Sequence, residues 1–109
     1  VNISSISGTR GNAGQTNYSS AKAAVVGLSK TLAKEWGRYN VAVNSVAFGL
    51  IETRLTEATD SKKIIEIEGK EIPMGRPGPP AEAAGAVVGL CLPQSDYISG
   101  QLIEVTGGL

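Results

Sequence analysis

The sequence predicts an α/β fold in which three strands form a small parallel sheet with flanking helices. Two observations carry this prediction. Strand-like segments alternate with helix-like segments along the chain, and residues 41–48 form a mostly apolar run with little polar alternation. Strands that alternate with helices form parallel sheets with right-handed crossovers. An unbroken apolar run is typical of a strand that is covered on both faces of such a sheet.

The first part of the chain is expected to contain a strand, a loop and a long helix. We expect the strand over residues 1–5 and, because glycines recur at every third position, a loop over residues 7–15. A helix is predicted from Thr16 to Arg38, with Thr16 or Asn17 as its N-cap and Gly37 and Asn40 at its end. Its apolar residues recur at three- and four-residue steps, as on one helix face: Tyr18, Ala21, Val25, Leu28, Leu32 and Trp36.

The second part of the chain is expected to contain two further strands and two further helices. A turn at 49–53 follows the apolar strand 41–48, and the mixture of charged residues with isoleucines over 57–70 predicts a surface helix. Pro80 suits the first turn of a helix that runs to about Leu92. The last strand is expected over 101–105, followed by two glycines.

The charge balance excludes several classes of protein. The 109 residues include ten Lys and Arg against ten Asp and Glu, so the formal net charge is zero. A nucleic-acid binder normally carries a basic patch, and a protein attracted to anionic lipid carries a polybasic segment. No apolar run approaches the length of a membrane span. We therefore expect neither a nucleic-acid partner nor a membrane partner.

The counts of two residue types exclude further chemistries. The chain has no His, which rules out a Ser-His-Asp triad and His-containing zinc sites within it. It has one Cys, Cys91, which rules out an internal disulfide and a thiolate cage, so no metal site is expected. Cys91 lies in an apolar stretch and is expected to be a small core residue. This cysteine usage fits a reducing, cytoplasmic setting.

Three residues form a candidate catalytic group. Tyr18 and Lys22 are four positions apart on the predicted helix and therefore share a face. Ser5 ends the first strand, and ligands of open α/β sheets bind outside the carboxyl ends of the strands. Such a trio supports proton transfer to a carbonyl oxygen, with a nearby ammonium favouring the phenolate. The hydride would come from a cofactor. The spacing also fits a core Tyr followed by a solvent-reaching Lys.

Several segments together resemble the classical short-chain dehydrogenase/reductase family, and most closely its 3-oxoacyl-[acyl-carrier-protein] reductase branch. The resemblance begins with Asn2-Ile3-Ser4-Ser5 and Gly8, and continues through the uninterrupted run from Gly11 to Lys22. It extends to Val43–Ala47 with Gly49, Ile51 and Thr53, to Ile72–Arg76, and to Ile98–Gln101 with Gly107 and Gly108. These segments cover essentially the whole chain.

The resemblance implies roles for six residues. Tyr18 would be the general acid in reduction, Lys22 would hold the nicotinamide ribose, and Ser5 would orient the substrate carbonyl. Gly49 belongs to the cofactor loop, where the backbone of Ile51 would meet the carboxamide and Thr53 the phosphates. The cofactor would be NADP or NAD, with NADP favoured by the branch. Residues from Arg54 to about Met74 would form a substrate lid.

The resemblance also implies a domain organisation. Residues 1–109 would be the C-terminal, catalytic half of a Rossmann-like, doubly wound parallel sheet, and the N-terminal dinucleotide-binding half would be absent. The opening of the chain inside a strand, without Met, agrees with that expectation. Glycines 8, 11 and 14 do not form the G-x-G-x-x-G fingerprint, because Arg10 occupies the needed position.

Two departures from the family pattern concern the second and third strands. Phe48 stands before Gly49 where the family usually has Pro, and Pro would fix the backbone of the cofactor loop. Phe48 is therefore expected either to pack in the core or to face the ligand. Thr106 stands where Asp or Asn is common.

The function predicted from the sequence is NAD(P)H-dependent reduction of a ketone, with a 3-oxoacyl thioester of fatty acid biosynthesis as the favoured substrate. The partners would be an acyl-carrier thioester or a small-molecule substrate and further copies of the chain, as a dimer or tetramer. Three alternatives stay open. The first is a non-catalytic fragment that keeps oligomerisation surfaces on residues 16–38 and 101–105, the second is a reductase of another ketone or alcohol, and the third is a nucleotide-sugar epimerase.

Overall fold

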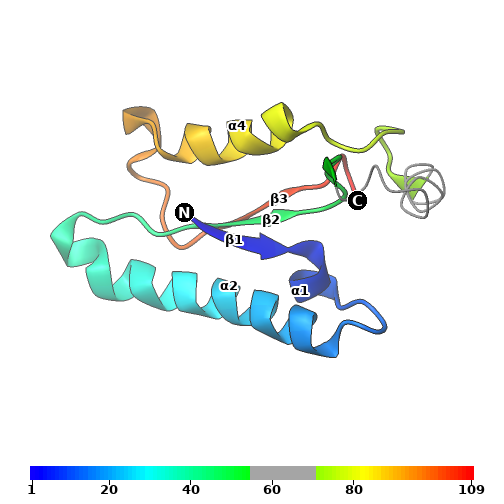
Figure 1. Cartoon of the computed structure of the whole chain (residues 1–109). Coiled ribbons are helices and arrows are strands. Elements are labelled where there is room, and N and C mark those ends of the chain that lie inside the picture. Colours follow the sequence, from blue (N-terminus) through cyan, green and yellow to red (C-terminus); the bar gives the residue numbers. More distant parts are fainter. Residues whose placement is uncertain (55–70) are drawn as a thin grey trace.

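The computed structural model describes residues 1–54 and 71–109. Three parallel strands form one sheet in the order β1-β2-β3: β1 (Asn2–Ser5), β2 (Ser45–Phe48) and β3 (Leu102–Val105). Helix α2 (Thr16–Trp36) covers one face of the sheet and α4 (Pro80–Leu90) covers the other (Figure 1). The predicted α/β class, with a three-stranded parallel sheet, is confirmed, and the arrangement is a partial Rossmann-like fold. The helix predicted over 57–70 lies outside the described residues.

The register of the sheet brings the ends of the three strands to one edge. Ser5 pairs with Phe48, and Phe48 pairs with Val105, so the last residue of each strand lies in one row. The central strand β2 contains Val46 and Ala47, both fully buried. It is shorter than predicted, because residues 41–44 precede the paired segment and Val41 is exposed.

A short helix, α1 (Ile6–Arg10), occupies the start of the segment that was predicted as a loop. The loop prediction is therefore wrong for these residues. Gly8 misled it, because this glycine serves packing rather than a turn. A Cβ atom at Gly8 would lie 2.7 Å from the backbone of Lys22 and Ala23, so only glycine lets α1 approach α2 this closely. Gly11, with φ of 78°, ends the helix.

Helix α2 begins at Thr16, as predicted, but its cap differs. The N-cap residue is Gln15, which makes no side-chain capping hydrogen bond, so neither Thr16 nor Asn17 has that role. The predicted end is confirmed, because a 3₁₀ turn, η1 (Gly37–Tyr39), follows and Asn40 adopts the left-handed conformation with φ of 60°. The expected apolar stripe is only partly covered, since the side chain of Leu28 is 53% exposed.

Helix α4 ends at Leu90, two residues before the predicted end, and a 3₁₀ turn, η3 (Pro93–Ser95), follows. Cys91 is the C-cap of α4 and is exposed, so the prediction that it is a core residue is wrong. The apolar neighbours of Cys91 suggested burial, but the helix ends at this position and its side chain faces solvent. Strand β3 begins one residue later than predicted, at Leu102.

One buried hydroxyl has no hydrogen-bond partner. Ser45 of β2 is 1% exposed, and its Oγ contacts no donor or acceptor. A buried, unsatisfied hydroxyl lowers stability by about 1–3 kcal/mol relative to an apolar group of the same shape. We expect Ser45→Ala to leave the free energy of unfolding unchanged or to raise it by up to ~1 kcal/mol, because the lost hydroxyl offsets a small cavity. Urea denaturation measures this, and a loss above ~1 kcal/mol would contradict it.

Candidate active site

All six site residues predicted from the sequence line one cavity. It has a volume of about 640 Å³ and lies between the carboxyl ends of β1 and β2 and the start of α4. Ser5 comes from β1, and Tyr18 and Lys22 come from α2. The loop after β2 supplies the other three, Gly49, Ile51 and Thr53. The rule that ligand sites form at the carboxyl edge of a parallel sheet therefore predicted this grouping correctly.

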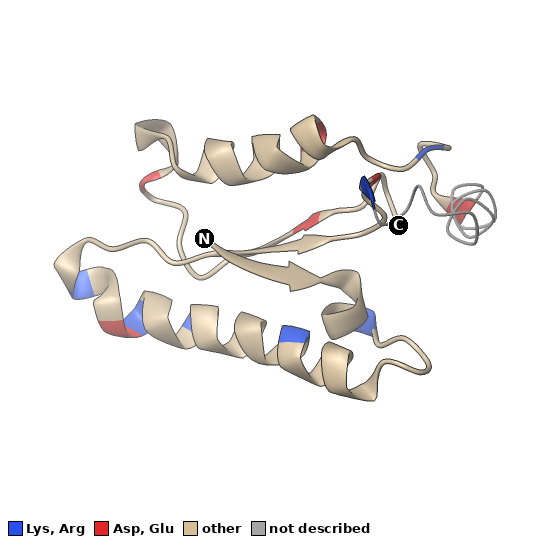
Figure 2. Ribbon diagram, viewed as in Figure 1, with Lys and Arg blue, Asp and Glu red and all other residues tan. Residues whose placement is uncertain are grey.

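Lys22 and Tyr18 face each other on consecutive turns of α2. The Lys22 ammonium lies 5.7 Å from the centroid of the Tyr18 ring. The same ammonium donates one hydrogen bond, at 3.3 Å, to the carbonyl oxygen of Ile3 in β1. Since an ammonium has three donors, Lys22 keeps hydrogen-bonding capacity for a further acceptor in the cavity. Figure 2 shows further basic residues along α2, and Lys22 is the one that reaches this cavity.

Ser5 has a structural function besides its place in the cavity. It is the N-cap of α1, and its Oγ accepts a hydrogen bond of 3.2 Å from the backbone N–H of Ser7. In residues 1–54 and 71–109, no group accepts a hydrogen bond from this hydroxyl. The cap therefore uses an acceptor site of Ser5 and leaves its proton available for donation to a ligand.

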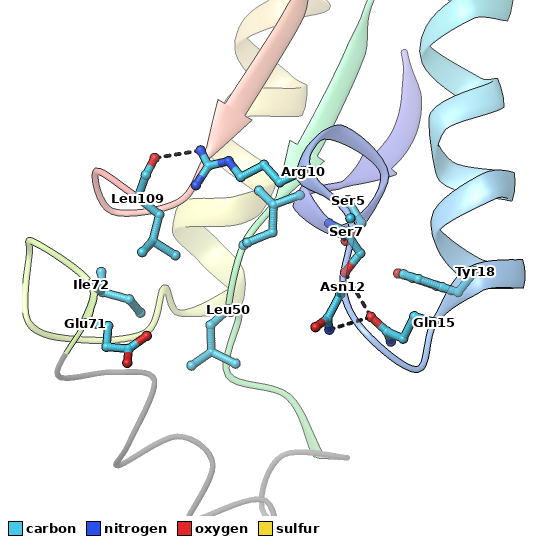
Figure 3. A pocket seen from close by; sticks show the side chains of 13 residues that line it. Ser5, Ser7, Arg10, Asn12, Gln15, Tyr18, Leu50, Glu71, Ile72 and Leu109 are labelled. Atoms are coloured by element: carbon cyan, nitrogen blue, oxygen red, sulfur yellow. Dashed lines mark hydrogen bonds between the residues drawn. The ribbon is translucent and has the colours of Figure 1, made fainter.

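A second cavity, of about 400 Å³, adjoins the first (Figure 3). The two cavities share four lining residues: Ser5, Tyr18, Gly49 and Leu50. Ser5 and Tyr18 therefore stand where two ligands would meet. Such an arrangement suits transfer between a cofactor in one cavity and a substrate in the other.

The second cavity has one polar and one apolar wall. On the polar side, Gln15 Oε1 accepts hydrogen bonds from Ser7 Oγ at 3.0 Å and from Asn12 Nδ2 at 2.7 Å. The apolar side consists of Leu50, Ile72 and Leu109, which come from distant parts of the chain (Figure 3). Sequence reasoning did not identify these wall residues. Their only signal was proximity to Tyr18 for Asn12 and Gln15, and Leu109 had none.

Arg10 closes the wall between the second cavity and β3. It donates hydrogen bonds to Glu104 Oε2 at 2.6 Å and to the carbonyl oxygen of Leu109 at 2.7 Å. Thr9 donates to the other carboxylate oxygen of Glu104 at 2.9 Å. These contacts fasten α1 to the last strand across the end of β2.

The loop after β2 is held in place despite the absence of proline before Gly49. Ile51 forms a parallel bridge with Gly78, and Gly78 exchanges backbone hydrogen bonds with Leu50 at 3.0 Å and Glu52 at 2.9 Å. A Cβ at Gly49 would lie 3.2 Å from Thr106 Cα, so glycine is needed for this close approach. Phe48 is half-buried and lines the larger cavity. Backbone pairing thus gives the loop the order that proline would have supplied.

Arg76 forms a bidentate ion pair near the start of α4. Its guanidinium donates to both carboxylate oxygens of Glu82, at 2.8 and 3.0 Å. This hydrogen bonding lowers the pKa of the Glu82 carboxyl and raises the pKa of Arg76. The contribution of the pair to stability is lost as the pH falls through the lowered pKa of Glu82. Because both groups are exposed, this contribution is small.

Two searches concern other kinds of site. The described part of the chain holds no group of three or more Cys, Asp or Glu side chains arranged to bind a metal ion. Among the helices of residues 1–54 and 71–109, none combines the length and apolar character that a bilayer span requires.

The fold and the site together define a class: an open, parallel α/β sheet with a Tyr–Lys pair and a Ser at the carboxyl edge of its strands. The family described as Enoyl-(Acyl carrier protein) reductase matches residues 1–109, the whole chain. The chain belongs to this family, which is part of the short-chain dehydrogenases/reductases.

Several curated proteins are similar to the chain over its whole length. It is 49% identical to the 3-oxoacyl-[acyl-carrier-protein] reductase FabG of Aquifex aeolicus and 47% identical to that of Thermotoga maritima, covering 44% of each protein. It is 47% identical to the (3R)-3-hydroxyacyl-CoA dehydrogenase of Homo sapiens, covering 41% of it. The chain therefore spans less than half the length of these relatives.

Proposed function

We propose that residues 1–109 are the C-terminal, catalytic half of an NAD(P)H-dependent reductase that acts on a 3-oxoacyl thioester. The observation that carries the proposal is the meeting of two cavities at Ser5 and Tyr18. Family membership and the names of the relatives support the oxidoreductase class and the thioester substrate. A preceding half would hold the pyrophosphate of the cofactor.

The residues of the larger cavity fit a nicotinamide nucleoside. Its walls include apolar side chains such as Ile51 and Val87, which suit the faces of a planar ring. The Lys22 ammonium, with donors left over after its bond to Ile3, suits the hydroxyls of a ribose. The bound cofactor supplies the hydride that no side chain can supply. We favour NADP over NAD because of the reductase branch that the chain resembles. Gly49 and Thr53 would contact the cofactor from the loop after β2.

In the proposed reaction Ser5 and Tyr18 act on the substrate carbonyl. Ser5 donates its free hydroxyl proton to the carbonyl oxygen and holds it in place. Tyr18 gives its phenolic proton to that oxygen as negative charge develops there. The Lys22 ammonium, 5.7 Å from the Tyr18 ring, stabilises the negative charge that remains on the phenol oxygen. The polar wall with Asn12 and Gln15 and the apolar wall with Leu109 suit a substrate that has polar and apolar ends.

The proposal extends to the setting of the enzyme. A 3-oxoacyl thioester reductase of this family would work in the cytoplasm, on a thioester attached to an acyl carrier. It would also form a dimer or tetramer with further copies of the chain. Exposed apolar side chains on α2, such as Leu28 and Trp36, support such an assembly, because apolar surface of this kind is usually covered by a partner.

Cofactor binding tests the proposed function. Because the pyrophosphate is assigned to a preceding half, fluorescence titrations with NADPH and NADH use the protein that contains both halves. The 109 residues alone are titrated in parallel. We expect saturable NADPH binding by the former, and about tenfold weaker binding in Lys22→Met, which loses charge-assisted hydrogen bonds.

Lys30→Met is the matched control for Lys22→Met. Lys30 is exposed, lies two turns further along α2, and does not line the larger cavity. Equal affinity for NADPH in the two variants would contradict the role given to Lys22. Absence of saturable binding by the folded protein would overturn the proposed function.

A further inference from the structure

Strand β1 presents two polar side chains to α2. Asn2 and Ser4 alternate with Ile3 and Ser5, so they share the face of the strand that α2 covers. Asn2 Nδ2 donates a hydrogen bond of 3.1 Å to Ser29 Oγ, and Ser4 Oγ donates one of 2.8 Å to the carbonyl oxygen of Lys22. We call these two hydrogen bonds the register contacts. Ser4 is 3% exposed and Ser29 is fully buried.

Apolar packing of α2 leaves its position along β1 weakly determined. Ser29 is the one buried residue of this helix, and its apolar residues on the sheet side, such as Val25 and Leu32, are half-buried. Apolar contacts are non-directional, whereas a hydrogen bond holds only over a narrow range of distance and angle. Buried polar pairs select the register of packed helices for this reason. The register contacts therefore select one position of the helix.

The two register contacts act at well-separated points. They are two residues apart on β1, about 7 Å, and seven residues apart on α2, about 10 Å. A slide of α2 by one residue, about 1.5 Å with a rotation of about 100°, would break both. The close approach of Gly8 to the Lys22 backbone holds the same turn of α2 from the side of α1.

The register of α2 decides the geometry of the candidate active site. Ser4 precedes Ser5 on β1, and the carbonyl that it holds belongs to Lys22 itself. Tyr18 lies one turn before Lys22 on the same helix. Any movement of α2 along β1 would therefore move Tyr18 and Lys22 together relative to Ser5.

We propose that Asn2, Ser4 and Ser29 are positioning residues, whose hydrogen bonds set the register of α2 on β1 and so hold Tyr18 and Lys22 opposite Ser5. The catalytic consequence rests on the proposed function, but the register itself does not. Ser4→Ala and Ser29→Ala each remove one contact. Ser45→Ala is the matched control, because Ser45 is a buried serine of the adjacent strand, pairs with Asn2 in the sheet, and makes no hydrogen bond.

The first measurement is steady-state turnover of NADPH with a 3-oxoacyl thioester by the protein that contains both halves. We expect kcat to fall about ten- to a hundredfold in Ser4→Ala, and less in Ser29→Ala, since small displacements of catalytic groups have effects of this size. Turnover in Ser45→Ala should equal that of the parent. A merely structural role would lower the unfolding temperature of Ser4→Ala while its folded fraction kept the parental kcat, and that result would overturn the proposal.

The second measurement needs no activity. The ring signals of ¹³C-labelled tyrosines are recorded by NMR, and the Tyr18 signal is identified by its absence in Tyr18→Phe. We expect Ser4→Ala and Ser29→Ala to shift this signal and Ser45→Ala to leave it in place. An unmoved Tyr18 signal in both register variants would overturn the proposal. Shifted signals in a protein without turnover would uphold the register and refute only the proposed function.

Discussion

Replacement of Tyr18 by Phe is expected to lower the kcat of thioester reduction by about 10²- to 10⁴-fold, the usual contribution of a general acid. The variant removes only the phenolic oxygen, and the ring that Lys22 faces at 5.7 Å stays in place. Binding of NADPH should therefore change little, so that the loss appears in kcat. Stopped-flow measurement of NADPH oxidation in a single turnover, with the variant in excess over the substrate, checks this.

Tyr97→Phe is the control for this prediction. Tyr97 is fully exposed and lines neither of the two cavities that meet at Tyr18. Its variant should keep the parental single-turnover rate. A Tyr18→Phe rate within a factor of two of the parent would exclude Tyr18 as the proton donor.

Replacement of Asn44 by Ala is expected to lower the free energy of unfolding by about 2–3 kcal/mol. Asn44 is 3% exposed and precedes β2. Its Nδ2 donates to the carbonyl oxygen of Ile98 at 2.8 Å, and its Oδ1 accepts from the N–H of Gln101 at 3.0 Å. Truncation leaves both backbone groups without a partner, at about 1–3 kcal/mol for each group that stays buried. Urea denaturation followed by circular dichroism measures the change.

Asn17→Ala is the matched control for Asn44→Ala. Asn17 is exposed in the first turn of α2, so its loss should change the free energy of unfolding by less than ~0.5 kcal/mol. If the two variants have the same stability, the two hydrogen bonds of Asn44 do not hold the segment before β3 in place.

The sequence predicted those parts of the fold that depend on local pattern. The apolar run of β2 indicated a buried central strand, and the three- and four-residue spacing indicated α2, because both patterns follow from the repeat of one element. Helix α1 was missed because Gly8 reads as a loop residue until the adjacent backbone of Lys22 is known. The exposure of Cys91 depends on where α4 ends, which is the least predictable property of a helix.

The candidate site shows the same division. The grouping of Ser5, Tyr18 and Lys22 followed from strand direction and helix spacing, which the sequence contains. The second cavity was not foreseen, because its walls join residues such as Gln15 and Leu109 that meet only through the tertiary fold. The roles of these residues in a reaction remain predictions, to be decided by the variants described above.

The fastening of α1 to β3 has a consequence for the order in which the protein assembles. Arg10 meets Glu104 and Leu109 across sequence separations of 94 and 99 residues. Contacts between such distant residues form late in folding, because a long loop must close first. During synthesis, Ser5, Tyr18 and Lys22 leave the ribosome long before the residues that complete the wall beside them. The newly made chain therefore holds its reactive groups in an open, unfinished cavity until its last strand joins the sheet.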